Sequence, residues 1–162
     1  MKTEKEFTDL VRAHKGTIYS VCYLFSQQAE EVDDLFQEVL NNLWQGFDHF
    51  EERSSVGTWV WRVSLNTCLT AERKKRRHAT FDPIEAHFNL YADNDSDSRQ
   101  IRQLHERIRG LKPFDRAIVL LWLEGMPYEE IAAIVGISVK NVSVRLYRIK
   151  ESLKQMSTPK NE

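Results

Sequence analysis

Apolar residues recur every three or four positions through almost the whole chain, and this spacing marks one face of an α-helix. The clearest example is the run Val32, Leu35, Phe36, Val39, Leu40, Leu43 and Phe47. No segment alternates between apolar and polar residues for more than a few positions, so a sheet is not expected. The pattern therefore predicts an all-α fold.

The helical pattern breaks between His78 and Ser98, where the sequence is ATFDPIEAHFNLYADNDSDS. This stretch is longer than the roughly 12–15 residues that are usual for a loop inside a compact domain. It also has several acids and no Lys or Arg. We therefore predict two small helical domains, 1–78 and 99–162, joined by an acidic flexible linker over 79–98. The apolar spacing predicts four helices in the second domain.

Two helix starts are predicted from local capping signals. Thr3 followed by Glu6 is typical of a capping box at the start of the first helix. The polar loop 51–57 (EERSSVG) precedes an apolar run, so Thr58 is the predicted N-cap of a helix that continues to about Arg77.

The composition excludes several classes of protein. The chain has 162 residues and a net charge of −1, with no apolar run near the roughly 18 residues that a membrane span needs. The start, MKTEKEFTDL, has no apolar signal region, so we expect a cytoplasmic protein without membrane insertion. Cys22 and Cys68 form neither a disulfide framework nor a metal-ligand spacing. Without a metal cluster, nucleotide loop or acid–base constellation, the sequence predicts binding rather than catalysis, with no cofactor.

Charge is segregated along the chain. The segment 27–52 has eight acids and no Lys or Arg, whereas 73–77 (RKKRR) is wholly basic and the last third is again basic. This separation indicates that the protein meets more than one kind of surface. Opposite the apolar stripe of the second predicted helix lies a polar face made of Asp33, Asp34, Gln37, Glu38 and Asn41.

The segment 128–150 (YEEIAAIVGISVKNVSVRLYRIK) carries the strongest local motif. Pro127 suits the first turn of a helix, and Gly136 suits a left-handed helix end. Ser138 is the predicted cap of the next helix. A short helix, a tight glycine turn and a longer helix form a helix-turn-helix, whose second helix enters the DNA major groove.

A helical wheel divides this second helix into two faces. The inward set is Val139, Val142, Leu146 and Ile149, and the outward set is Lys140, Asn141, Val144 and Arg148, with Arg145 at the edge. A structural helical hairpin with a solvated face is the alternative. The combination of the small Ala132, the Gly136 turn and the Ser138 cap favours DNA binding.

A second polar stripe lies on the predicted third helix. At 100° per residue, its members fall within about 60° of one another; they are Arg62, Asn66, Arg73 and Arg77. Trp59 and Trp61 stand at the start of this helix, and aromatic side chains beside basic ones suit the unstacked bases of a single strand. Alternatively, the basic run is a solvated helix end, and at least one tryptophan is expected in the core.

These segments together resemble a bacterial RNA polymerase sigma factor of the sigma-70 family, in its extracytoplasmic-function (ECF) group. DDLFQEVLNNLW (33–44) is similar to the polymerase-binding helix of the family's first domain. The segment 50–77 is similar to the part that melts the promoter and recognises its minus-ten element. The segment 111–153 is similar to the domain that recognises the minus-thirty-five element.

The resemblance implies roles for individual residues. Contacts with the clamp helices of the largest polymerase subunit are implied for Asp33, Asp34, Gln37, Glu38 and Asn41, and the flap of the second-largest subunit is a further implied partner. The loop 51–57 would hold a flipped base. Minus-ten contacts are implied for Glu51, Glu52, Arg53, Ser54, Ser55, Trp59, Arg62, Asn66, Arg73, Lys74, Lys75, Arg76 and Arg77. Minus-thirty-five contacts are implied for Ser138, Lys140, Asn141, Ser143, Val144, Arg145 and Arg148.

The resemblance further implies an anti-sigma factor as a partner, and a linker path through the channel otherwise used by RNA. Two residues depart from the family pattern. Pro127 stands where a capping Ser is frequent, and Val144 stands where a small polar residue is frequent. An alternative function is that of a stand-alone dimeric helix-turn-helix repressor or activator, which would bind DNA without polymerase.

Overall fold

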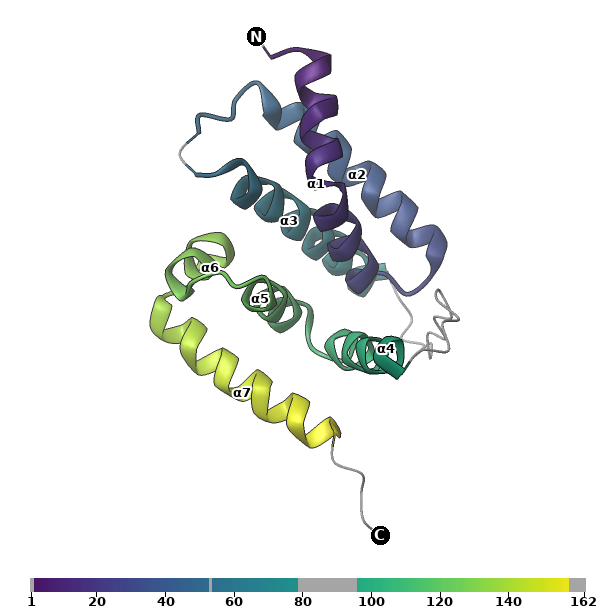
Figure 1. Cartoon of the computed structure of the whole chain (residues 1–162), viewed down its shortest axis with the longest axis vertical. Helices are drawn as coiled ribbons and strands as arrows, with labels where there is room; N and C mark the ends of the chain where they lie inside the picture. The colour runs from purple at the N-terminus through teal and green to yellow at the C-terminus, as the bar shows by residue number, and fades with distance from the viewer. Residues whose placement is uncertain (1, 53, 79–95, 158–162) are drawn as a thin grey trace. The chain divides into compact units, whose positions relative to one another are not determined.

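The computed structural model describes residues 2–52, 54–78 and 96–157. Over these residues the chain is all-α, as predicted, and has no strand. The helices, coloured along the chain in Figure 1, are α1 (Glu4–Phe25), α2 (Ala29–Phe47), α3 (Val56–His78), α4 (Ser96–Arg109), α5 (Pro113–Leu123), α6 (Tyr128–Val135) and α7 (Val139–Ser157).

The chain divides into two compact units, residues 1–90 and 91–162. The division falls within the predicted linker 79–98, whose residues 79–95 lie outside those described. Because α4 begins at Ser96, the last residues assigned to that linker are helical. No helix among the described residues has the length and apolar character to cross a membrane.

The first unit is a bundle of α1, α2 and α3, each of which contacts the other two (Figure 1). Most of the predicted apolar stripe of α2 faces the core, with Val32, Leu35, Val39, Leu43 and Phe47 buried. The other two members, Phe36 and Leu40, are only half-buried. Cys22 of α1 and Cys68 of α3 are buried in the same core and are not joined by a disulfide. A hydrogen bond with the Cys22 thiol, and then burial, raise the pKa of the Cys68 thiol well above its ordinary value.

The capping box at the start of α1 is confirmed. The Glu6 amide donates to Thr3 Oγ1, and the Thr3 amide donates to the Glu6 carboxylate. The predicted N-cap of α3 is wrong. The helix begins at Val56, and its cap is Ser55, whose Oγ accepts the Thr58 amide at 3.1 Å. Thr58 instead lies buried in the first turn, where its hydroxyl accepts a hydrogen bond from Ser55 Oγ at 2.9 Å.

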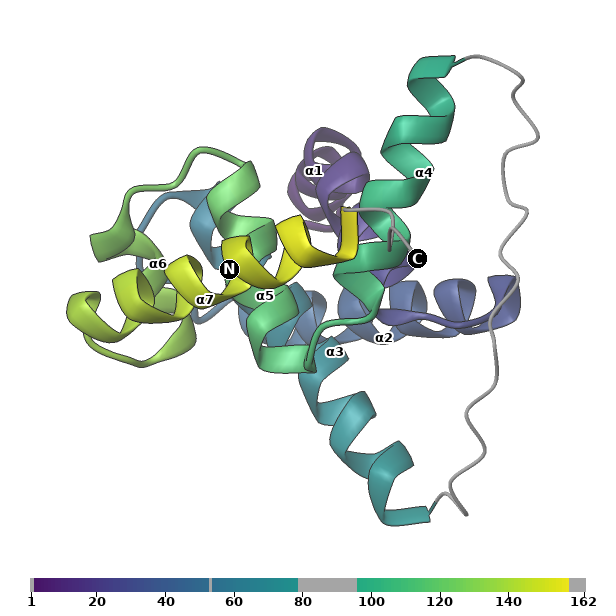
Figure 2. The same cartoon turned by 90° about the horizontal axis from the view of Figure 1, so that it is seen from below.

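The second unit contains α4 to α7, and α5, α6 and α7 contact one another (Figure 2). Gly136 ends α6 with φ of 78°, in the left-handed region that glycine enters without a Cβ clash. Ser138 caps α7 by accepting the Asn141 amide at 3.1 Å. The helix-turn-helix is therefore built as predicted. Pro127, however, is the N-cap of α6 rather than a residue of its first turn.

The apolar seam of this unit differs from the predicted one at a few positions. Val142, Leu146 and Ile149 are buried as expected, but Val139 is 41% exposed because it begins α7, where no further turn covers it. Leu123, at the end of α5, and Ile101 and Leu104 of α4 are likewise exposed. The seam begins at Val142 and not at Val139.

Candidate protein and nucleic-acid interfaces

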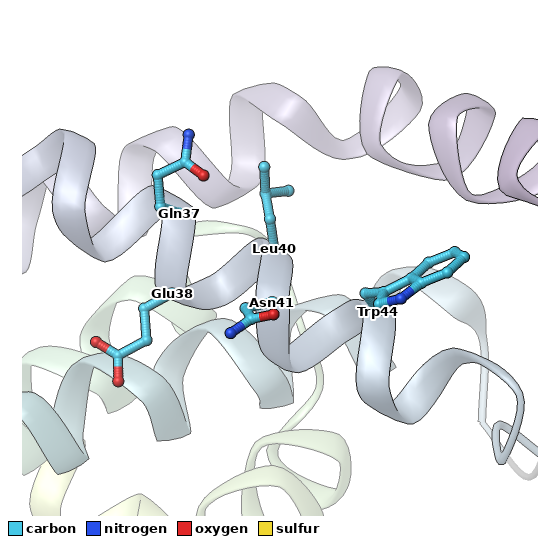
Figure 3. A pocket seen from close by; sticks show the side chains of 5 residues that line it. All are labelled: Gln37, Glu38, Leu40, Asn41 and Trp44. Carbon is cyan, nitrogen blue, oxygen red and sulfur yellow. The ribbon is translucent and has the colours of Figure 1, made fainter.

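The outer face of α2 is polar and exposed, as the sequence predicts. Asp33, Asp34, Gln37, Glu38 and Asn41 are all exposed. A shallow hollow on this face is lined by Gln37, Glu38, Leu40, Asn41 and Trp44. Figure 3 shows Gln37 and Leu40 extending from one side of α2 and Glu38 from the other, with Asn41 between them. The face combines negative charge with amide groups and a small apolar patch.

Trp44 is a member of this surface that sequence reasoning did not assign a role. Its side chain is 48% exposed. It packs edge-on against Phe7 of α1, with the ring centroids 5.0 Å apart. The available signal was spacing, because Trp44 follows Asn41 by three positions and so shares its side of the helix.

The two tryptophans at the start of α3 have different environments. Trp61 is buried at 6% exposure, which confirms that at least one of the pair belongs to the core. Trp59 is half-buried and stacks on Phe50, with centroids 4.8 Å apart, and on Phe47 at 6.4 Å. Only Trp59 keeps an accessible surface, so it is the one that could meet a base.

The polar stripe of α3 is brought to the surface. Asn66, Arg73 and Lys74 are exposed and Arg62 is half-buried. Lys75 is exposed as well, but its Nζ lies 2.9 Å from the Glu31 carboxylate of α2. The charge of Lys75 is therefore partly neutralised within the protein. Arg53 and the side chains of Arg76 and Arg77 lie outside the described part of the structure.

The loop before α3 has its own local order. Glu52 adopts φ of 56°, a left-handed conformation that is uncommon for residues other than glycine. Lys2 approaches this loop, because its Nζ donates to the Phe50 carbonyl at 3.2 Å and lies 4.9 Å from the Phe50 ring centroid. Glu51 and Glu52 are exposed and Ser54 is half-buried. The Ser55 hydroxyl already caps α3.

A hollow of about 260 Å³ lies between α2 and α3. Its lining residues are Glu38, Asn42, Val63, Asn66, Thr67 and Thr70. Asn42 Nδ2 donates to Thr67 Oγ1 at 2.9 Å, and that hydroxyl donates to the Val63 carbonyl at 2.7 Å. This chain of hydrogen bonds joins α2 to α3 beside Asn66. Sequence reasoning missed Asn42, Thr67 and Thr70, because the hollow and the Asn42–Thr67 hydrogen bond form only where two helices meet.

The outward face of α7 is largely as predicted, since Lys140, Asn141, Ser143, Val144 and Arg148 are all exposed. Ser138 is exposed too, with its hydroxyl engaged as the cap. Arg145 differs from the others. Its Nη1 lies 3.1 Å from Asp115 Oδ1 of α5, and its guanidinium lies 4.8 Å from the Phe114 ring centroid. Arg145 is thus held at the edge of the face by α5.

Both units of the chain match known protein families. Residues 10–78 match the family Sigma-70 region 2. Residues 101–153 match the family Sigma-70, region 4. The chain belongs to the sigma-70 family of RNA polymerase sigma factors.

Individual relatives place this sigma factor in the ECF group. It is 26% identical to the ECF RNA polymerase sigma factor SigW of Bacillus subtilis, over 92% of this chain and 87% of that protein. It is 29% identical to the ECF RNA polymerase sigma-E factor of Escherichia coli, over 96% of this chain and 88% of that protein. The ECF sigma factor SigE of Mycolicibacterium smegmatis is 28% identical over 90% of this chain, which spans only 59% of SigE.

Two solved structures share the fold of this sigma factor. The sigma factor RpoE of Bartonella quintana, in complex with the anti-sigma factor NepR, aligns with a TM-score of 0.75 and 21% identity over 94% of this chain and 96% of that one. CnrH, in complex with the cytosolic domain of CnrY, aligns with a TM-score of 0.68 and 22% identity over 95% of this chain and 88% of that one.

This sigma factor is accordingly a transcription initiation factor that directs RNA polymerase to promoters. It acts by binding and is not an enzyme. The stand-alone regulator considered from the sequence is not favoured, because the first unit matches a sigma region rather than a ligand or dimer module.

Proposed function

We propose that this sigma factor uses three surfaces, one to bind polymerase and two to recognise the promoter. The face of α2 docks on the clamp helices of the largest polymerase subunit, and the second unit meets the flap of the second-largest subunit. The α3 stripe with the preceding loop binds the melted minus-ten strand. The outward face of α7 enters the major groove of the minus-thirty-five element.

The exposed face of α2 is the observation that supports polymerase docking. Three carboxylates, Asp33, Asp34 and Glu38, lie on the exposed face of a helix whose opposite side is largely buried in the core. Charge of one sign on an exposed face steers a partner of the opposite sign and fixes its orientation. The adjoining hollow and the half-exposed Trp44 add the apolar anchor that interface centres commonly use.

The minus-ten role is supported by the arrangement around Asn66. Asparagine amides can pair with a base edge, and Asn66 lies exposed on a hollow lined by further amide and hydroxyl groups. Trp59 presents a partly accessible aromatic face at the start of the same helix. Arg73 and Lys74 follow it as exposed cations that suit a phosphate backbone.

We further propose that an anti-sigma factor covers these surfaces when the protein is idle, and that the protein works in the cytoplasm, where the polymerase acts. Support for the first point comes from RpoE of Bartonella quintana, which shares the fold and was solved with the anti-sigma factor NepR. The acidic face of α2 and the exposed apolar residues of α4 are the surfaces that would need covering.

Charge reversal on α2 tests the docking surface. We expect Asp34→Lys with Glu38→Lys to abolish co-elution with core RNA polymerase while the helical content by circular dichroism stays unchanged. The matched control is Glu4→Lys with Asp9→Lys, which makes the same charge change at exposed positions of α1 and should still co-elute. Normal co-elution of the α2 variant would assign this face to another role.

Promoter melting provides the test of α3. We expect Asn66→Ala with Trp59→Ala to retain polymerase binding and to depress open-complex formation on duplex promoters. Because extruding a base costs about a few kcal/mol, a promoter with a pre-melted bubble should recover much of the loss. Equal loss on both templates would mean that these two residues serve packing.

A further inference from the structure

Two exposed apolar side chains of the helix-turn-helix lie on the face proposed to contact DNA. On α7, Tyr147 is 68% exposed and Val144 is 41% exposed. Lys140 and Arg148, both exposed, stand one turn before and one turn after Val144 on the same side of the helix. Val144 is therefore an apolar spot in the middle of a cationic row.

The neighbouring cation does not cover this spot. Arg145 is drawn toward α5 by Asp115, with its guanidinium against the Phe114 ring. Val144 lies in the second turn of α7, among the N-terminal residues that contact base edges when a recognition helix enters the major groove. Tyr147 lies in the next turn, from which a hydroxyl can reach phosphate oxygens.

The side chain of valine has no hydrogen-bond donor or acceptor, so it can recognise a base only through an apolar group on that base. The major-groove edge of DNA offers one such group, the C5-methyl of thymine, while the other base edges present donors and acceptors. Bringing Val144 against those polar edges would leave them without partners.

We propose that Val144 is a specificity-determining residue that recognises one thymine of the minus-thirty-five element through its C5-methyl group. This inference rests on the proposed function, because it needs α7 in the major groove. Lys140 and Arg148 hold the helix on either side of that base, by contacts with phosphates or guanine, and Val144 selects the base between them.

Replacement of thymine by uracil tests the proposal, because it removes the methyl group and leaves the pairing unchanged. A preferred promoter is first selected from a random duplex pool with the holoenzyme. Deoxyuridine then replaces each thymidine of the minus-thirty-five element, one at a time and on both strands. With the wild-type holoenzyme we expect one replacement to weaken binding by about fourfold, the effect of burying one methyl group.

The residue is identified by repeating the series with variants. Val144→Ala should lose the uracil penalty at that position and bind both duplexes equally, and Val144→Ile should keep the penalty. Val139→Ala is the matched control, because Val139 is also 41% exposed on α7 but lies about 140° around the helix from Val144. It should keep the full penalty.

Three outcomes would overturn the proposal. They are a wild-type holoenzyme indifferent to every uracil replacement, a penalty that persists unchanged in Val144→Ala, and a penalty that Val139→Ala also removes. The second would assign the exposed Val144 and Tyr147 to a protein partner instead. A duplex with the whole minus-thirty-five element scrambled distinguishes a failure of thymine recognition from a failure of the minus-thirty-five function. If scrambling also has no effect, the minus-thirty-five function itself is wrong, whereas a large scrambling effect leaves that function standing without thymine recognition.

Discussion

The two helices proposed to contact DNA, α3 and α7, are held in the protein by different kinds of interaction. The start of α7 is fixed by neighbours in sequence, namely the left-handed Gly136 and the Ser138 cap. The exposed side of α3 is shaped by residues far away in sequence. Glu31 binds Lys75, Asn42 binds Thr67, and Phe50 stacks on Trp59.

This difference predicts how each surface responds to change. A locally encoded feature such as a glycine turn is disrupted when the glycine itself is replaced, and the resulting loss of stability is confined to the unit that contains it. A surface shaped by contacts from outside its helix can be altered by substitutions in α2, or in the loop before α3, that leave α3 itself unchanged. The helix proposed to open DNA is thereby coupled to α2, the helix proposed to hold polymerase, whereas the start of α7 is set by its own short segment.

The largest expected effect separates the two tryptophans of α3. Trp61→Ala should cost about 3–5 kcal/mol of unfolding free energy, because it empties a buried site of a large side chain. Trp59→Phe keeps an aromatic ring in the stack with Phe50 and should cost about 1 kcal/mol or less. Urea unfolding followed by circular dichroism measures both. Similar losses in the two variants would mean that Trp59 is as much a core residue as Trp61.

The same pair shows what the sequence could and could not predict. Helical spacing predicted the all-α fold and the buried stripe of α2, and glycine and cap signals predicted the turn before α7, because each depends on residues within a few positions. The position of the α3 cap was missed, since Ser55 and Thr58 are both of a type that caps helices. Spacing alone could not decide which tryptophan is buried, because burial is set by α1 and α2.

Contacts across helices were also beyond sequence reasoning. Asp115 and Arg145 are thirty positions apart, and Asn42 and Thr67 are twenty-five apart. Neither pair leaves a periodic signal, because a polar residue in one helix does not indicate its partner in another helix. The residue types of the surfaces proposed to face DNA were therefore readable from the sequence, and the intramolecular partners that restrain them were not.

A substitution at Gly136 should show that the α7 start depends on local conformation. Gly136→Val should destabilise the second unit by about 1–2 kcal/mol, because a residue with a Cβ is strained at φ of 78° even though no atom lies within 4 Å of that Cβ. Gly16→Ala is the contrasting change, at a helical glycine of α1 that also has open space. It should raise stability by about 0.5–1 kcal/mol. Thermal unfolding measures whether the first variant is less stable, and the second more stable, than the wild type.

A double-mutant cycle should measure the coupling of α2 to α3. Asn42→Ala and Thr67→Val each remove one side of the 2.9 Å hydrogen bond, and we expect a coupling energy of about 1 kcal/mol. In the holoenzyme, Asn42→Ala should also slow open-complex formation while polymerase affinity stays the same, since the bond lies beside Asn66. An additive cycle with normal melting kinetics would show that the two helices are independent.

The smallest stability effect is expected at Asp115 of α5, which holds Arg145 at the edge of the outward α7 face. The Asp115–Arg145 pair is partly exposed, so Asp115→Ala should change stability by less than about 1 kcal/mol. Removing the carboxylate leaves Arg145 available to phosphates. Holoenzyme binding to any duplex should then strengthen, and its salt slope should steepen by about one unit.

Arg148→Ala is the comparison, because loss of a base-contacting arginine should cost about 1–3 kcal/mol and relax preference at one position. If Asp115→Ala instead relaxes preference at a single base pair with an unchanged salt slope, α5 is orienting Arg145 toward a base, and α7 depends on distant contacts as α3 does.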